Sequence, residues 1–282
     1  MPLTLPHGGG LYRTRANGAD IRYLRAGTGT PVVLLHTLRT QLDMFGSLLQ
    51  HLDTARAEVI AVDLPGHGES SAPPVRYTAG YFTDTAAALL EACQVTSAVV
   101  VGESIGGSIA LGLAARRNPR VAQVIAINPY DYGRGGGIRR SSLVAGIAFT
   151  GMLWPVLGPA IAYSEPKPIL RQILQGGLRD PGNLPPDLLE VIHRCGRLPG
   201  HPRAFRSLCQ EWRTWITARS GYPAIEVPVT LAYGDADWSR PAERDANAKA
   251  IRAVRTVTLT DSGHFSSLEH PRDIAHLIHQ LT

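Results

Sequence analysis

The sequence contains little cysteine and little lysine. Its three cysteines, Cys93, Cys195 and Cys209, are odd in number and widely spaced, which excludes a disulfide scaffold. No cysteine–histidine cluster has zinc-ligand spacing, so we expect no metal. Only Lys167 and Lys249 are lysines, so the net charge of +5 rests on arginines spread along the chain. Nucleic-acid-binding proteins usually concentrate their basic residues in a stripe or a known motif, and we therefore expect no such partner.

Two membrane-related features are also missing. Residues 1–10 have no basic region followed by an apolar run, so we expect no signal peptide, and the cysteines fit a reducing, cytoplasmic location. Residues 141–164 carry no charge and are long enough to span a bilayer. Pro155, Gly158 and Pro159 interrupt this stretch, and proline breaks helices. We expect a broken apolar lid or pocket wall there, with membrane contact as the alternative.

The residues that are present indicate a folded α/β protein. The chain has 282 residues, of which 44% are hydrophobic and 18% charged. Short apolar runs alternate with amphipathic helical patterns over residues 31–127 and again over residues 228–281. This alternation predicts a mostly parallel sheet with helices on both faces. We assign residues 1–130 and 223–282 to this core, and residues 131–222 to a helical cap inserted before the strand that carries the acid.

One motif joins an apolar strand to a helix. The residues from Gly102 to Gly106 read Gly-Glu-Ser-Ile-Gly, the pattern of a nucleophile elbow in the strand–turn–helix context that this turn requires. The turn holds Ser104 in a strained conformation, and glycines two residues before and after it avoid a steric collision. The helix start also brings the Ile105 N–H close to an oxygen that becomes negative during acyl transfer.

A nucleophilic serine needs a base and a group that orients the base. His264 follows the last predicted strand and therefore lies at the same sheet edge as Ser104. Asp237, three residues after the glycine that ends the preceding strand, is our first choice for the acid. Asp131 and Asp235 are the alternatives, and Asp235 is better suited to bracing its own turn.

These motifs resemble those of the α/β-hydrolase superfamily, in the same order and spacing. The resemblance implies the α/β-hydrolase fold, a Ser-Asp-His triad and no cofactor. It leaves the reaction open, because the superfamily includes esterases, thioesterases, lactonases, carbon–carbon bond hydrolases and other enzymes. Related dehalogenases and epoxide hydrolases carry Asp at the elbow, whereas a serine suits acyl transfer. The resemblance rests on His36 after the strand 32–35 and on residues 63–70, 102–107, 234–237 and 263–271.

The loop after residue 35 departs from the family pattern. Relatives usually have glycine after the histidine, whereas this chain has Thr37, which removes a permissive backbone position. We place the second oxyanion donor at the Leu38 N–H, alongside that of Ile105, with Thr37 as the alternative. Arg39 either meets an acidic group of the substrate or lies on the surface.

We expect a largely apolar pocket. Several residues flank the predicted machinery in sequence or belong to the uncharged stretch that could roof it. The candidate pocket residues are Thr37, Arg39, Tyr130, Leu153, Trp154, Trp238 and Phe265.

The favoured function is a serine hydrolase that cleaves a carboxylic ester or thioester of a small molecule, with an apolar acyl or aryl group, through an acyl-enzyme. Three alternatives use the same fold. The triad can cleave carbon–carbon bonds, or it can run cofactor-free perhydrolysis or acyl transfer. The protein can also be a ligand receptor with a vestigial triad.

Overall fold

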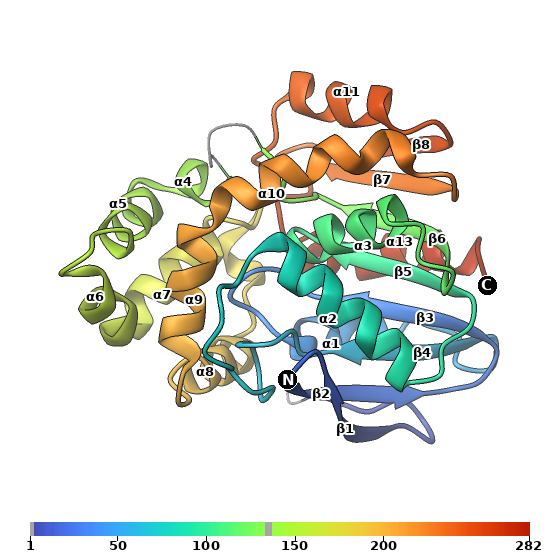
Figure 1. Cartoon of the computed structure of the whole chain (residues 1–282), viewed down its shortest axis with the longest axis horizontal. Helices are drawn as coiled ribbons and strands as arrows, with labels where there is room; N and C mark the ends of the chain where they lie inside the picture. Colours follow the sequence, from blue (N-terminus) through green and yellow to red (C-terminus); the bar gives the residue numbers. More distant parts are fainter. Residues whose placement is uncertain (1–2, 133–136) are drawn as a thin grey trace.

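The computed structural model describes residues 3–132 and 137–282; residues 133–136, which belong to the predicted cap, lie outside the described part. One eight-stranded sheet forms the centre of the molecule, in the order β1-β2-β4-β3-β5-β6-β7-β8 (Figure 1). The first two strands and the β2–β4 pair are antiparallel, and every later pair is parallel. The strands are β1 (Gly10–Ala16), β2 (Ala19–Ala26), β3 (Thr30–Leu35), β4 (Ala57–Val62), β5 (Ala98–Glu103), β6 (Val121–Ile127), β7 (Val229–Gly234) and β8 (Val254–Leu259).

The parallel strands are buried on both faces, as their continuous apolar sequences predict. In β3, Val33 and Leu35 face one hydrophobic core, whereas Val32 and Leu34 face the other, because successive side chains of a strand point to opposite faces. Helices α2 (Ala79–Ala92), α3 (Ile105–Ala115) and α11 (Pro241–Ala250) cover the first face. Helices α1 (Gly46–Leu49) and α13 (Pro271–His279) cover the second. The predicted fold class is confirmed.

All helices of the insertion come between β6 and β7. Figure 1 shows α4–α9 gathered at one side of the molecule, beyond the ends to which the parallel strands point. These helices are α4 (Gly137–Ser141), α5 (Leu143–Met152), α6 (Gly158–Ser164), α7 (Lys167–Gln175), α8 (Pro186–Cys195) and α9 (His201–Gln210), with the 3-10 turn η3 (Pro181–Asn183) before α8. Among the described residues, no helix combines the length and apolar character needed to cross a membrane.

The last part of the insertion returns to the core. Helix α10 (Trp212–Ala218) packs on α2 and α3, and the 3-10 helix η4 (Arg219–Ala224) packs on α3. Trp215 and Tyr222 are buried there against the core. The predicted cap boundary at residue 222 therefore falls within η4, which packs on the core. The helices that lie beyond the strand ends are α4–α9.

Helix α3 approaches the sheet very closely at Gly106. A Cβ atom added to this glycine would lie 2.1 Å from the carbonyl oxygen of Leu35 in β3. No side chain fits at that distance, so a glycine is required here for the helix to begin directly above the strand ends.

This contact yields a stability prediction. Gly106→Ala should lower the free energy of unfolding by about 3 kcal/mol, because the new methyl group overpacks backbone that cannot shift cheaply. Gly46→Ala is the matched control: its Cβ would meet nothing within 4 Å, and it should leave stability unchanged or raise it by up to about 1 kcal/mol. Urea unfolding measures both. Equal stability of the two variants would contradict the proposed tight packing of α3 on β3.

Candidate active site

Ser104 lies in the sharp turn between β5 and α3. Its backbone has φ 57° and ψ −117°, a conformation that residues other than glycine rarely adopt. The turn is so tight that a Cβ atom on Gly102 would lie 2.1 Å from the carbonyl oxygen of Gly106. The Ser104 amide donates to the Ile127 carbonyl at 2.9 Å, which ties the turn to the end of β6. The strain is therefore held by the surrounding backbone.

His264, on the loop after β8, links Ser104 to a carboxylate. Its Nε2 lies 2.8 Å from Ser104 Oγ, and its Nδ1 lies 2.5 Å from Asp237 Oδ1. An ionised carboxylate only accepts hydrogen bonds, so Nδ1 carries the proton and Nε2 is free to accept from the serine. The imidazole stacks on the Trp238 ring, with centroids 3.8 Å apart. All three polar side chains are buried.

Asp237 is held as an anion by its neighbours. Its Oδ2 accepts hydrogen bonds from the Tyr132 hydroxyl at 3.0 Å, from the Ser239 amide at 2.9 Å and from the Ser239 hydroxyl. Burial acts to raise the pKa of Asp237, but His264 and the two Ser239 donors outweigh burial and lower the pKa. Asp237 therefore stays charged next to the imidazole.

The two alternative acids lie elsewhere. Asp131 accepts from the Tyr222 hydroxyl at 2.7 Å and from the Asn247 amide at 3.0 Å, and has no recorded contact with His264. Asp235 accepts the backbone amides of Asp261 and Ser262 at 3.0 and 3.2 Å. It therefore braces the loop that carries His264, whereas we expected it to brace its own turn.

Sequence reasoning missed the residue that joins the strand ends. The Asn128 side chain donates to the carbonyls of Gly263 and His264 and accepts the Gly234 amide at 2.9 Å. It thus fixes the loops after β6, β7 and β8 relative to one another. Tyr132, the donor to Asp237, was missed as well. The signal available for Asn128 was its position directly after a predicted strand, where loop polar residues of a parallel sheet gather. Tyr132 lies further along the same loop.

The loop after β3 is braced by a neutral histidine. His36 Nε2 accepts the Leu64 amide at 2.9 Å, and its Nδ1 lies 2.7 Å from the Thr37 carbonyl. Burial lowers the pKa of His36 to about 4, so the ring is neutral and donates from Nδ1. Thr37 adopts an ordinary backbone conformation, and the left-handed residue of this loop is Arg39, with φ 64°. Position 37 therefore does not require glycine in this loop.

A small cavity adjoins Ser104. Its volume is about 20 Å³, which is enough for one water molecule. Ser104, His264 and Leu38 line it. The α7 residues Ile173 and Leu174 also line it, and the sequence did not indicate them. Five of the seven candidate pocket residues form the rest of the wall: Thr37, Arg39, Tyr130, Trp238 and Phe265.

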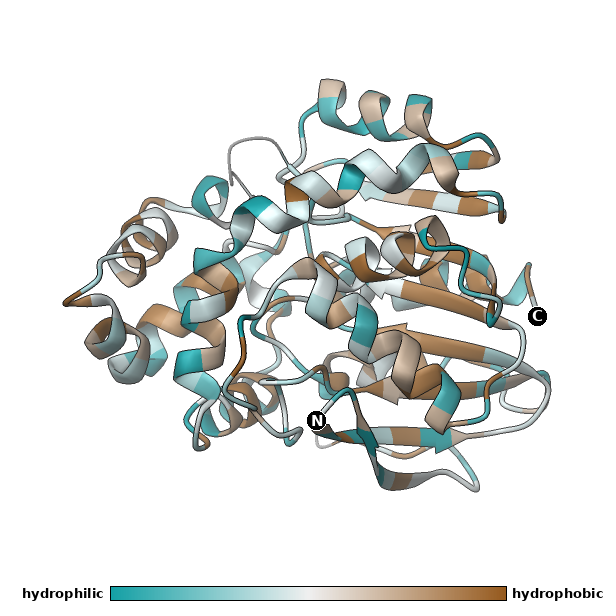
Figure 2. Cartoon of the chain, viewed as in Figure 1, coloured by the Kyte–Doolittle hydropathy of each residue, from teal (hydrophilic) through white to brown (hydrophobic). Residues whose placement is uncertain are grey.

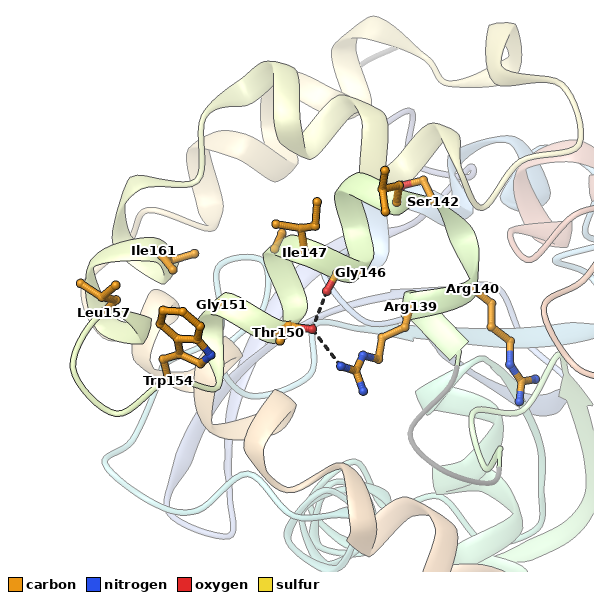
Figure 3. A pocket seen from close by; sticks show the side chains of 12 residues that line it. Arg139, Arg140, Ser142, Gly146, Ile147, Thr150, Gly151, Trp154, Leu157 and Ile161 are labelled. Carbon is orange, nitrogen blue, oxygen red and sulfur yellow. Dashed lines mark hydrogen bonds between the residues drawn. The ribbon is translucent and has the colours of Figure 1, made fainter.

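Two candidate pocket residues lie outside this cavity. Trp154 is 56% exposed and lines a separate groove of about 810 Å³ on the outer side of the cap (Figure 3). Leu153 is half-buried against the hydrophobic core. The expectation that both roof the active site is wrong, because α7 rather than the α5–α6 connection covers Ser104 in this structure.

The Arg39 side chain is only 11% exposed, so the surface alternative for this residue is wrong. Its Nε donates to Glu165 Oε1 at 3.1 Å, its second nitrogen pairs with Oε2 of the same carboxylate, and its guanidinium lies 5.1 Å from the Phe205 ring centroid. Burial lowers the pKa of Arg39 to about 10, so the side chain remains a cation at neutral pH. It thus presents a positive charge to the cavity wall.

Glu103, directly before the nucleophile, is fully buried. Its Oε1 accepts the Ser267 amide at 3.0 Å, and no partner for its Oε2 is found in the part of the chain that the structure describes. Burial raises the pKa of Glu103 to about 8. Among residues 3–132 and 137–282, no cluster of three or more His, Cys, Asp or Glu side chains could hold a metal ion.

Comparison with known proteins places this geometry in a family. The chain is 29% identical over 273 residues to the dihydrolipoyllysine-residue acetyltransferase component of the acetoin cleaving system of Cupriavidus necator; the match covers 93% of this chain and 66% of that protein, so the chain spans just under two thirds of this relative. It is 29% identical over 255 residues to the pimeloyl-[acyl-carrier protein] methyl ester esterase of Neisseria meningitidis, covering 87% and 91% of the two chains.

A solved structure shares the fold. Cfl2 from Burkholderia cenocepacia superposes with a TM-score of 0.84 at 19% identity, over 97% of this chain and 96% of the other. The sequence model described as the alpha/beta hydrolase family matches residues 32–277. Because this match takes in the parallel sheet, the turn at Ser104 and the loop of His264 together, the chain belongs to the alpha/beta hydrolase family of enzymes.

Proposed function

We propose that the protein is a serine hydrolase that cleaves carboxylic esters or thioesters through an acyl-enzyme. The observation that carries this proposal is the unbroken series of hydrogen bonds from Ser104 Oγ through His264 to Asp237. A serine next to a base, which is itself oriented by a carboxylate, is the arrangement that activates a hydroxyl for attack on an acyl carbon.

In the first half of the reaction, Ser104 Oγ forms a bond to the acyl carbon while its proton moves to His264 Nε2. Asp237 stabilises the imidazolium that results. The carbon–oxygen or carbon–sulfur bond to the leaving group then breaks, and the leaving group takes the proton from Nε2. The product of this half is an ester between Ser104 and the acyl group.

In the second half, a water molecule replaces the leaving group. His264 takes a proton from the water, whose oxygen attacks the acyl carbon. The bond to Ser104 Oγ breaks, the proton on Nε2 returns to Oγ, and the carboxylic acid leaves. The cavity beside Ser104 has room for one water molecule.

Two backbone amides are suited to hold the oxyanion. Ile105 is the first residue of α3, so its N–H has no acceptor within the helix and points towards negative charge at the helix N-terminus. Leu38 lies in the loop braced by His36 and lines the cavity. One oxyanion donor is worth about a hundredfold or more in kcat.

The wall of the cavity supports an acyl or aryl group that is apolar near the scissile bond. Leu38, Ile173, Leu174 and Phe265 supply aliphatic and aromatic surface close to Ser104. The similarity to a methyl ester esterase along most of both chains supports ester cleavage.

The first test is Ser104→Ala. We expect kcat for p-nitrophenyl esters or acyl thioesters to fall at least about a thousandfold, because the nucleophile is lost. Circular dichroism and thermal unfolding should show the native fold. Ser108→Ala, one turn further along α3 and buried as well, is the control and should keep most of its activity.

A substrate panel and a covalent probe complete this test. A fluorophosphonate should label the native protein and not Ser104→Ala. Undiminished ester turnover by Ser104→Ala would contradict the serine mechanism. Faster cleavage of a vinylogous diketone than of every ester would favour a carbon–carbon bond hydrolase, and a folded protein that the probe does not label would favour a receptor.

The raised pKa of Glu103 predicts that activity falls at alkaline pH. Its raised pKa of about 8 means that the carboxyl is neutral below this pH and charged above it. Deprotonation adds a negative charge beside Asp237 and the developing oxyanion, so kcat/KM should fall above pH 8. Glu103→Gln should keep its activity to higher pH, because the amide cannot ionise. Identical pH profiles of Glu103→Gln and wild type between pH 7 and 10 would exclude this role.

A further inference from the structure

The cavity beside Ser104 is too small for a substrate. A volume of about 20 Å³ admits a water molecule and no acyl chain. Ile173 and Leu174 of α7 form part of its wall, and α7 begins at Lys167, two residues after Glu165. An acyl group that enters this cavity needs part of the wall to shift, and α7 is the part of the wall that belongs to the cap.

A shift of α7 would separate an ion pair that is largely buried. Arg39 belongs to the oxyanion loop of the core, whereas Glu165 lies in the cap just before α7. Their side chains are only 11% and 13% exposed. Glu165 is also the only acidic residue between Asp131 and Asp180 in the sequence, so the cap offers no second carboxylate in this region.

A buried guanidinium without an anionic partner is strongly unfavourable. Arg39 cannot easily withdraw into solvent, because its side chain is enclosed by Phe205 and by Gly196, where an added Cβ would collide with the guanidinium. Opening the cavity is therefore favourable only if another anion replaces the Glu165 carboxylate. A substrate that carries its own anionic group supplies this anion in the same step that fills the cavity.

We propose that Arg39 is the receptor for a carboxylate at the far end of the substrate, and that Glu165 occupies this position while the site is empty. The proposal rests on the proposed ester hydrolysis and narrows its substrates to acyl compounds with an apolar middle and an anionic end. A planar guanidinium pairs with a carboxylate through two parallel hydrogen bonds, as it does with Glu165.

Matched esters test this proposal. The mono-p-nitrophenyl esters of C5–C8 dicarboxylic acids carry a free carboxylate, and the p-nitrophenyl esters of alkanoic acids of equal length do not. For wild type, we expect kcat/KM to be at least tenfold higher for the anionic member at the best chain length. Glu165→Gln should lower KM for the anionic esters several-fold, because the competing carboxylate is gone.

The key variant is Arg39→Asn. Asparagine tolerates the left-handed backbone at this position and removes the charge. The anionic preference should disappear, with kcat/KM lowered at least tenfold more for the anionic esters than for the neutral ones. Arg39→Lys should restore part of the preference. Arg171→Met, which removes an exposed arginine of α7, is the control and should leave the preference intact.

The outcomes separate this proposal from the proposed function. If wild type hydrolyses neutral and anionic esters equally well, or if Arg39→Asn lowers both equally, Arg39 is not a carboxylate receptor although the enzyme is an esterase. If no ester of either kind is cleaved and the fluorophosphonate does not label Ser104, the hydrolase proposal itself fails.

A separate observation concerns the outer side of the cap. Ten large apolar side chains are exposed in the described part of the chain, and six of them lie between residues 143 and 163. Helix α5 is apolar around its whole circumference, yet only Ala145, Phe149 and Met152 are buried. Figure 2 shows the resulting apolar colour along α5 and α6, at the edge of the molecule. These six residues form a surface that we call the outer cap face: Leu143, Ile147, Trp154, Val156, Leu157 and Tyr163.

The segment that forms this face carries only positive charges. Residues 132–164 include arginines and no Asp or Glu, although Arg140 at the groove pairs with Glu243. Arg139 is exposed at the rim of the groove, where it contacts the Thr150 hydroxyl and the Phe149 ring (Figure 3). Trp154 and Tyr163 are side-chain types that favour the boundary between water and lipid. An apolar surface of this extent is unusual for a face that stays in water.

We also propose that the outer cap face docks on a lipid bilayer that carries anionic headgroups. Apolar side chains of α5 and of the α5–α6 connection would enter the boundary between headgroups and acyl chains, and Arg139 would meet a lipid phosphate. The helices would lie on the membrane and not cross it, in keeping with their lengths of 10 and 7 residues.

Vesicle binding tests this second proposal. Wild type should sediment with vesicles of 30% phosphatidylglycerol in phosphatidylcholine, and more weakly with pure phosphatidylcholine. Ile147→Ser combined with Trp154→Ala should reduce binding to the anionic vesicles at least fivefold. Leu11→Ser, an exposed leucine of β1 remote from the cap, is the control. No binding of wild type would overturn the proposal. A dimer in analytical ultracentrifugation that the double variant abolishes would show that a second copy covers this face instead.

Discussion

The close approach of backbone at the elbow is the constraint on which the active site depends. Ser104 occupies a strained turn because β5 ends directly below the start of α3, and this is possible only where Gly102 and Gly106 leave room for carbonyl oxygens about 2 Å from any Cβ. The turn directs the serine hydroxyl over the sheet edge, where β7 and β8 also end. Asn128 then holds the three neighbouring loops together, so the positions of His264 and Asp237 follow from the same edge.

The titratable side chains at this edge of the sheet differ in their charge states. His36 is neutral, Glu103 is neutral below pH 8, and Asp237 is an anion stabilised by three donors besides His264. The surroundings of the nucleophile therefore carry the negative charge of Asp237, where the imidazolium forms, and the ion pair of Arg39 with Glu165. Burial makes each of these charges expensive unless it has a partner, which links the chemistry at Ser104 to the contact between Arg39 and the cap.

The cap has two surfaces with different tasks. Its inner side closes the cavity with α7 and is anchored to the His264 loop, since Gly177 accepts the amides of His264 and Phe265, and Glu269 accepts those of Arg179 and Asp180. Its outer side presents the apolar residues of α5 and α6 to the surroundings. The cap is thus attached to the core near residues 177–180 and at Glu165.

The sheet, the elbow and the chain order of the triad candidates followed from the sequence, because strand ends and glycine spacing are set by local patterns of a few residues. The sequence favoured Asp237 over Asp131 only weakly, because both residues come after strands that end at the same edge of the sheet. The geometry of the loops decides which carboxylate reaches His264. The packing of the cap did not follow at all. Apolar residues such as Trp154 and Ile173 look alike in sequence, and which of them faces Ser104 depends on how short helices pack. The partner of Arg39, 126 residues away, was likewise decided by the tertiary structure alone, because ion pairs between distant segments leave no local signal.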